Sequence, residues 1–328
     1  MQFPRLPRFK RAHAVPVIEL TERDREVVRL VYRHRFLRSS QIISLVGGSE
    51  QQLLRRLQLL YHHGYLERPR CQIDSYHKGG SRYIVYGLGN KGASLLKQEL
   101  GIAFRGLSWS EKNSSLGRVF LEHTLLVGDV MVAIELACRR TGIRLLTEGE
   151  LAPPLVANRK GPLFRWKVKV TGGLKLSVIP DRVFALEFKD QAGHSNRAVF
   201  FLEADRGTMP VIRRTLTQTS FFRKLLAYEA TWSQSIHRSK FDFHRFRVLT
   251  VTTSAARVKS LVDACSKLKR GQGLFLFADQ TILEKPGELF SRLWQTATPG
   301  QTTSLFPEMG FRLRPEEQQN SVISSTIE

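Results

Sequence analysis

Apolar residues recur at helical spacing in three short stretches near the start of the chain. Thr21 stands before the first stretch, Ser39 and Ser40 open the second, and Ser49 precedes the third. Serine and threonine favour helix N-caps, and Asp24 completes the pattern of a capping box with Thr21. The apolar positions of these three predicted helices are Val27, Val28, Leu30 and Val31, then Ile42, Ile43 and Leu45, then Leu53, Leu54, Leu57 and Leu60.

Glycines and strand patterns complete the picture of this first region. The Gly-Gly pair at 47–48 ends the second helix, and Gly64 stops the third. Two short helices joined by a glycine turn predict a helix-turn-helix. Residues 64–70 and 81–89 have the pattern of two strands joined by a polar loop, and a further helix is expected over residues 91–100. The hairpin would be the wing of a winged helix-turn-helix domain.

The predicted winged helix spans residues 18–101 and follows a basic N-terminal arm at 1–17. Opposite its leucines, the third helix carries side chains that can reach base edges or phosphates in a DNA major groove, and the wing carries three more that could hold the backbone. These candidates are Gln51, Gln52, Arg55, Arg56 and Gln58 on the helix, and His77, Lys78 and Arg82 on the wing. The alternative is a three-helix structural module whose basic face is merely solvated.

The pattern changes after residues 102–116, which are polar, rich in glycine and serine, and predicted to be a linker. Residues 117–140 have the pattern of a long amphipathic helix. Strands are then expected within 142–151, 177–188 and 196–205, a helix over 211–232, a strand over 246–253, and a further helix and strand within 256–279. The order α, β, β, β, α, β predicts an α/β domain over residues 117–285. Residues 286–328 are expected to be a tail, disordered from about Gly300.

Charge indicates the class of partner. The chain of 328 residues has 51 Lys plus Arg against 29 Asp plus Glu, a net charge of +22. Such an excess favours a polyanion, and we expect double-stranded DNA. Because no run of 18 apolar residues and no secretory signal is present, we expect a cytoplasmic protein that does not bind membrane. Cys71, Cys138 and Cys265 are too far apart for a zinc site or disulfide framework, so buried thiols are expected.

Acidic residues gather at strand ends in the second predicted domain. Asp181 follows Pro180 at the start of the second strand, and Glu203 and Asp205 end the third. Strand residues alternate, so the side chains at 203 and 205 point to the same face. Two like charges on one face need a cation, a basic neighbour or solvent to offset their repulsion. The basic neighbours that could form solvated ion pairs with them are Arg206, Arg213 and Arg214.

The element order and these acids resemble the core of the PD-(D/E)xK nuclease superfamily. The resemblance implies an αβββαβ nuclease-like domain in which Asp181 and Glu203 bind Mg²⁺ or Mn²⁺. Asp205 would be a third ligand, and Glu122 on the preceding helix a further one, with His123 facing the same cleft. In such enzymes the ion stabilises the charge that develops as water attacks a phosphodiester.

One position departs from the superfamily pattern. The usual lysine two residues after the glutamate is replaced by Asp205. Lys224 on the following helix and Lys189 beyond the second strand are candidates to replace it, whereas Arg206 points to the other face if the strand continues. The catalytic set implied by the resemblance is Asp181, Glu203, Asp205 and Lys224. A basic rim of Arg213, Arg214, Arg223 and Lys224 would suit phosphates.

Basic and aromatic residues are interleaved between residues 158 and 173. Phe164 and Trp166 lie among Arg159, Lys160, Arg165, Lys167 and Lys169. This pattern could hold single-stranded DNA by charge and stacking. An ordinary exposed hairpin would have the same pattern.

The whole arrangement resembles the replication-relaxation family of plasmids and integrative elements. The resemblance covers roughly residues 18–255 and depends on "LEHTLLVGD", "PD", "FFLEADRGT" and "KLLAY" after a winged helix. It implies a DNA-binding protein acting in plasmid replication or relaxation of origin DNA, with replication or relaxosome proteins as partners. A nuclease-like domain that cuts or nicks DNA is the leading hypothesis. The alternative is a non-enzymatic accessory or regulatory factor on an inactive nuclease-like scaffold.

Overall fold

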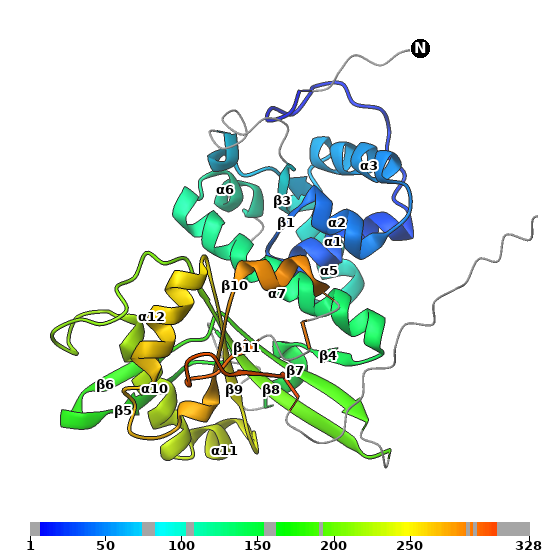
Figure 1. Cartoon of the computed structure of the whole chain (residues 1–328). Helices are drawn as coiled ribbons and strands as arrows, with labels where there is room; N and C mark the ends of the chain where they lie inside the picture. Colours follow the sequence, from blue (N-terminus) through cyan, green and yellow to red (C-terminus); the bar gives the residue numbers. More distant parts are fainter. Residues whose placement is uncertain are drawn as a thin grey trace, which may run out of the picture.

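The protein is a mixed α/β chain. Its computed structural model describes residues 7–73, 83–102, 108–153, 162–189, 193–286, 289–290 and 294–306. An N-terminal unit of short helices and a small sheet lies beside a larger sheet that has helices on both faces (Figure 1). The long helix α7 (Arg118–Thr141) runs between the two.

Three helices build the N-terminal unit at the predicted positions. They are α1 (Glu22–His34), α2 (Ser39–Val46) and α3 (Glu50–His62). Thr21 Oγ1 accepts a hydrogen bond from the Asp24 N–H, and the Asp24 carboxylate accepts one from the Thr21 N–H at 2.8 Å. The predicted capping box is therefore present. Gly47 ends α2, and Ser49 caps α3.

A small antiparallel sheet completes this unit. Its order is β1 (Phe36–Arg38), β3 (Val85–Leu88) and β2 (Leu66–Glu67), and α5 (Asn90–Leu100) follows β3. β2 and β3 pair as predicted, but the loop between them includes residues 74–82, so His77, Lys78 and Arg82 lie outside the described residues. The sequence did not predict β1, which has only three residues and starts directly after Arg35 ends α1 with a φ of 70°.

The leucines of α3 do not all face the core. Leu53, Leu57 and Leu60 are at most 1% exposed, whereas Leu54 is 39% exposed. The prediction that Leu54 belongs to the apolar face is therefore wrong, because the contacts of α3 with the rest of the unit cover only a narrow stripe of the helix. Arg55, beside Leu54, is also exposed.

Part of the basic N-terminal arm packs on the unit. Arg11 donates hydrogen bonds to the carbonyl of Tyr61 at 3.1 Å and to the Glu67 carboxylate at 2.8 Å. The buried Arg68 guanidinium lies 4.2 Å from the Tyr61 ring centre and donates to the carbonyl of Arg8. These contacts attach residues 8–11 to the end of α3.

The predicted linker contains an ordered helix. Within residues 102–116, α6 (Trp109–Ser114) packs on the N-terminal unit. Asn113 is fully buried and donates a hydrogen bond to the carbonyl of Leu88 at 2.7 Å. Trp109 faces the Arg35 guanidinium, 4.6 Å from the centre of the Trp109 ring. The domain boundary itself stays a prediction.

The larger sheet has seven strands. In spatial order they are β12 (Thr302–Thr303), β11 (Trp294–Gln295), β10 (Phe275–Asp279), β9 (Arg247–Thr252), β8 (Ser195–Asp205), β7 (Arg182–Lys189) and β4 (Arg144–Leu146). β8, β9 and β10 are parallel, and the outer pairs are antiparallel. Parallel neighbours require crossover helices, and the sequence order supplies them between β8, β9 and β10.

Helices cover both faces of the sheet. α7 packs against one face through residues such as Ile134, which belongs to the same apolar cluster as the strand residues Phe184, Phe200 and Leu249. The other face is covered by α10 (Phe221–Ser233), α11 (Ile236–Phe241), α12 (Ala255–Cys265) and the hairpin β5 (Trp166–Lys169) to β6 (Lys175–Val178). Alternation along each strand supplies apolar side chains to both cores.

The side of α7 away from the sheet holds the N-terminal unit. Arg38 forms an ion pair with Asp129, and His34 Nε2 lies 3.2 Å from the Glu135 carboxylate. Burial would raise the pKa of Glu135, but His34, Arg33 and Arg139 lower it to about 2. These contacts join the two units through one helix.

Three sequence expectations are corrected here. Phe164 and Trp166 are each 3% exposed, so these aromatic rings are not available to stack on bases, although the β5–β6 hairpin does expose the face that carries Lys167 and Lys169. The helix expected from residue 211 begins at Phe221, because the preceding threonine-rich stretch has low helix propensity. The expected tail contributes β11, β12 and a fully buried Leu305 to the sheet and its core. Arg159 and Lys160 lie outside the described residues.

Two of the three cysteines match their prediction. Cys138 and Cys265 are buried thiols, and Cys71 is half-buried. Burial raises the pKa of Cys138 and of Cys265 to about 12. Across the described ranges, every helix is too short or too polar to cross a membrane.

Candidate functional site

Asp181 and Glu203 lie side by side at the edge where β7 begins and β8 ends. Arg182 is opposite Leu202 in the antiparallel register, which places Asp181 opposite Glu203. Residues that are opposite in an antiparallel pair point to the same face. Remote parts of the chain therefore bring these two carboxylates together as the sequence predicted.

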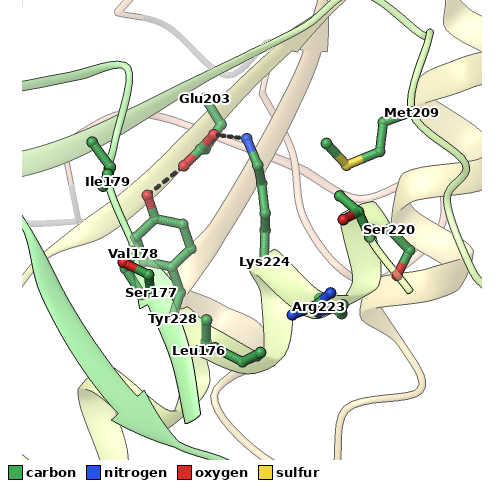
Figure 2. A pocket seen from close by; sticks show the side chains of 12 residues that line it. Leu176, Ser177, Val178, Ile179, Glu203, Met209, Ser220, Arg223, Lys224 and Tyr228 are labelled. Carbon is green, nitrogen blue, oxygen red and sulfur yellow. Dashed lines mark hydrogen bonds and ion pairs between the residues drawn. The ribbon is translucent and has the colours of Figure 1, made fainter. Parts of the chain in front are cut away.

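Glu203 is almost fully buried and has both carboxylate oxygens engaged. Lys224 Nζ donates to Oε2 at 2.5 Å, and the Tyr228 hydroxyl donates to Oε1 at 2.5 Å (Figure 2). Both donors lie on α10, one turn apart, so the helix presents them to the strand as a pair. Tyr228 was not selected as a site residue from the sequence.

Burial and neighbouring charges shift the pKa values of these groups. Burial raises the pKa of Glu203, although Lys224 acts in the opposite direction. For Lys224, burial would lower the pKa, but the Glu203 and Asp181 carboxylates raise it above its ordinary value. Burial also raises the pKa of Tyr228 well above its usual range, so the phenol remains a hydrogen-bond donor. Lys224 is therefore a cation held between two acids.

Asp181 is fixed by one backbone and one side-chain partner. Its Oδ2 accepts from the Ala204 N–H at 2.8 Å, and its Oδ1 lies 3.0 Å from His123 Nε2. Burial would raise the pKa of Asp181, but His123 and Lys224 hold it below its usual value. The hydrogen bond to Asp181 in turn raises the pKa of His123. His123, which lies on α7, therefore contacts Asp181, as the sequence led us to expect.

The structure distinguishes the three residues that could take the place of the superfamily's usual lysine. Lys224 contacts Glu203, whereas Lys189 stands at the far end of β7, opposite Ser195. Arg206 turns the other way and donates to the carbonyl of Val119 at 3.1 Å. Lys224 is the one that joins the acidic pair.

Asp205 does not share in this group of contacts. Arg257 of α12 binds its carboxylate with two donors, at 2.7 Å to Oδ2 and 3.2 Å to Oδ1. Thr252 Oγ1 adds a third hydrogen bond at 2.9 Å. The predicted alternative of solvated pairs with Arg206, Arg213 or Arg214 is also wrong for Asp205, which is 7% exposed and has Arg257 as its partner.

Glu122 is likewise engaged by arginines. Arg118 Nε donates to its Oε1 at 2.6 Å, and Arg206 donates to its Oε2. Among the described residues, no three His, Cys, Asp or Glu side chains are grouped so as to hold a metal ion. Of the four carboxylates predicted as metal ligands, Asp181 and Glu203 are the two that lie side by side.

A cavity of about 250 Å³ opens beside Glu203 (Figure 2). Glu203, Lys224 and Tyr228 line one part of it, and Arg223 and the buried Ser220 at the start of α10 line another. The described loop before α10 carries Arg213 and Arg214, both exposed. The cavity can admit a small anionic group next to Lys224.

A comparison with protein families matches residues 28–243 to the replication-relaxation family. The chain belongs to the replication-relaxation family. Comparison with curated proteins and with solved structures gives no match. The matched span of this replication-relaxation protein includes α3 and the Asp181–Glu203 pair, and the family points to a role in plasmid replication or relaxation.

The second candidate surface of this replication-relaxation protein is the outer face of α3. Gln51, Gln52 and Arg55 are exposed, and Gln58 is half-buried. Arg56 differs, because its guanidinium binds the buried Asp24 carboxylate and the carbonyl of Glu19. The prediction that Arg56 faces DNA freely is therefore corrected: it is an internal ion-pair partner of α1.

Sequence reasoning missed two partners of the site acids. Tyr228 stands four residues after Lys224 within "KLLAY", so helical spacing alone places both on one face. Arg257 lies 52 residues beyond Asp205, and no local pattern connects them. Only the parallel pairing of β8 with β9, which puts Asp205 beside Thr252, brings the start of α12 to this carboxylate.

Proposed function

We propose that this chain is a cytoplasmic DNA-binding protein of a mobile element that acts in plasmid replication or DNA relaxation. The N-terminal unit acts as a winged helix that contacts duplex DNA through α3. The C-terminal unit acts as a PD-(D/E)xK-like domain that cuts or nicks a phosphodiester bond with Mg²⁺ or Mn²⁺.

DNA as the substrate is supported by charge and by family. A net charge of +22 favours a polyanion, and the replication-relaxation family implies DNA or replication-related partners. The exposed amide and guanidinium groups of Gln51, Gln52 and Arg55 can donate to phosphates or base edges. Arg213 and Arg214 are exposed on the loop that leads into α10 and could hold a second stretch of backbone.

The observation that carries the nuclease proposal is the meeting of Asp181, Glu203 and Lys224. They come from the residue just before β7, from β8 and from α10, and Lys224 donates a hydrogen bond to Glu203 and helps to lower the pKa of Asp181. Two carboxylates and one ammonium group are the donor set that the nuclease superfamily uses, and here Glu203 and Lys224 line the cavity.

The metal would be held by Asp181 and Glu203. Mg²⁺ is commonly bound by one or two protein carboxylates, with waters and substrate phosphates completing its octahedron, so this pair fits such an ion. When bound, the ion would polarise the phosphate and activate water. Lys224 would shift from Glu203 towards the phosphate, and Tyr228 would keep the second Glu203 oxygen oriented.

A second function is favoured by a different observation. Both oxygens of Glu203 already accept hydrogen bonds, and Asp205 and Glu122 are bound to arginines. A fully engaged set of acids is what a non-enzymatic DNA-binding accessory factor on an inactive scaffold would have.

Cleavage separates the two functions. Purified full-length protein is incubated with supercoiled plasmid and Mg²⁺ or Mn²⁺, alongside Asp181→Ala, Glu203→Ala and Lys224→Ala. Metal-dependent nicking that all three variants lose supports the enzyme. Lys189→Ala is the matched control, since it removes an equal charge at the far end of β7 and should nick normally.

Absence of nicking with either metal, in protein that still binds the plasmid, supports the accessory factor. Nicking that survives Glu203→Ala would show that the activity arises elsewhere.

DNA binding has its own test. Arg55→Ala should weaken binding to a duplex of arbitrary sequence and reduce the slope of log K against log salt by about one if Arg55 contacts a phosphate. Arg140→Ala, an exposed arginine near the end of α7, is the matched control. Equal binding by both variants would move the contact surface away from α3.

A further inference from the structure

An apolar side chain lies in the middle of the polar face of α3. Leu54 is 39% exposed, although the leucines at 53, 57 and 60 of the same helix are buried. A single exposed leucine needs no explanation by itself. The side chains around Leu54, however, point to a function for it.

Leu54 shares its face with side chains that form hydrogen bonds. Positions 51, 54, 55 and 58 are separated by three, one and three residues, which places Gln51, Leu54, Arg55 and Gln58 on one side of a helix. The face therefore presents two amides and one guanidinium around a branched aliphatic group. Glu50 and Gln52 flank it at the N-terminal end of α3, and Glu50 is the one acid among these exposed side chains.

A second basic group lies at the turn that leads into α3. A methyl group added to Gly48 would be 2.8 Å from Arg23 Nη2, so the Arg23 guanidinium lies over the α2–α3 turn. A cation at this point can hold a phosphate while the N-terminal half of α3 enters a groove.

We propose that Leu54 reads a thymine in the DNA major groove through its 5-methyl group, with Gln51, Arg55 and Gln58 reading adjacent bases. This inference rests on the proposed function, because it assumes that α3 contacts duplex DNA. The thymine methyl is the one apolar group on a base edge in the major groove. Amide side chains match adenine and a guanidinium matches guanine, so the face fits a mixed site that contains at least one thymine.

Charge favours DNA over a protein partner on this face. The chain carries +22, Arg55 lies on the same face of α3 as Leu54, and Arg23 lies over the turn that precedes α3. Sites that bind another protein usually bury a contiguous apolar patch, whereas Leu54 is surrounded by polar side chains.

The test removes the methyl group from the DNA. Full-length protein selects a consensus from a library of random-sequence duplexes, and the consensus is then synthesised with each thymine in turn replaced by deoxyuridine. Wild-type affinity should fall about fourfold at the contacted thymine, which corresponds to about 0.8 kcal/mol at about 1.4 kcal/mol per factor of ten. Leu54→Ala should bind the thymine and deoxyuridine duplexes equally.

Leu100→Ala is the matched control, because Leu100 is 52% exposed at the end of α5 and should leave the thymine preference unchanged. The inference is overturned if no thymine is sensitive, if Leu54→Ala keeps the preference, or if selection yields no consensus. A change in sedimentation of Leu54→Ala without loss of thymine preference would assign Leu54 to a protein contact and overturn it as well. Salt-dependent binding of wild type to unselected duplex tests the proposed function separately.

Discussion

Arg55 and Arg56 are adjacent in sequence, and their replacement should have opposite consequences. Arg56→Ala removes the guanidinium that binds Asp24, whose side chain is 1% exposed. Arg55→Ala removes an exposed side chain from the outer face of the same helix. The first change should destabilise the N-terminal unit, and the second should weaken DNA binding alone.

The expected loss of stability in Arg56→Ala depends on the hydrogen bonds that Asp24 keeps. In Arg56→Ala the carboxylate keeps hydrogen bonds from the Thr21 N–H at 2.8 Å and the Thr21 hydroxyl at 2.7 Å. Breaking a fully buried ion pair costs about 3–5 kcal/mol. Because Asp24 remains partly satisfied and the Arg56 side chain is 28% exposed, we expect a loss of about 2 kcal/mol. Arg55→Ala should stay within about 0.5 kcal/mol of wild type.

Acid should remove the difference between Arg56→Ala and wild type. Burial would raise the pKa of Asp24, but Arg56 and Thr21 hold it below its ordinary value. The stabilisation is therefore complete above the unfolded pKa of about 4 and is lost as the pH falls through the lower folded value. The two proteins should converge in stability only after the pH has fallen below the lowered folded pKa of Asp24.

Urea unfolding of the full chain, with hydrogen exchange to localise the change to α1 and α3, measures the effect. If Arg56→Ala is as stable as Arg55→Ala at pH 7, Arg56 does not support Asp24. If both variants are equally stable and equally impaired in DNA binding, the original assignment of both arginines to DNA was correct.

Three further predictions concern other buried groups. Asp205→Ala and Arg257→Ala should each destabilise the chain by about 3 kcal/mol, and the double variant by clearly less than the sum, because each single change leaves a buried charge alone. His62, which accepts a hydrogen bond from the Ala12 N–H at Nδ1, has its pKa lowered to about 4 by burial. Stability from neutral His62 is present above about pH 6.5 and is lost as the pH falls towards 4, so hydrogen exchange should show the arm leaving α3 over this window. Trp166→Ala should cost about 3–5 kcal/mol in urea unfolding and leave binding to single-stranded DNA unchanged.

Each of these has an outcome that contradicts it. Additive effects of the Asp205 and Arg257 replacements would mean that the two side chains do not interact. If hydrogen exchange at the arm does not depend on pH in wild type, or still depends on pH in His62→Gln, then His62 is not the cause. Weakened binding of single strands by folded Trp166→Ala would restore the stacking hypothesis for that hairpin.

Much of the fold follows from local patterns. The capping box at Thr21, the glycine turn at 47–48 and the long apolar repeat of α7 are determined by neighbours in sequence, and all three are present. β1 and β12 were missed because they have only three and two residues and are stabilised by pairing with distant strands. Strands so short have no periodicity to detect.

The site was only half predictable for a related reason. Strand alternation was enough to place Asp181 beside Glu203 once the two strands were known. The same alternation put Asp205 on the face of Glu203, but Arg257 reaches Asp205 from a helix whose position depends on the sheet order. Leu54 gives a second example in α3. Helical spacing identifies the leucine-rich side of the helix, but only the packing of the helix determines which leucines at its edge are buried.

α7 has 24 residues and is therefore about 36 Å long. His123 near its start touches Asp181, while Asp129 and Glu135 further along hold the N-terminal unit. Under the proposed function, this one helix would fix the distance between the DNA-contacting face of α3 and the phosphate chemistry at Asp181. A nick made by this protein would fall at a constant offset from the sequence recognised by α3, and lengthening the segment before α7 would leave that offset unchanged.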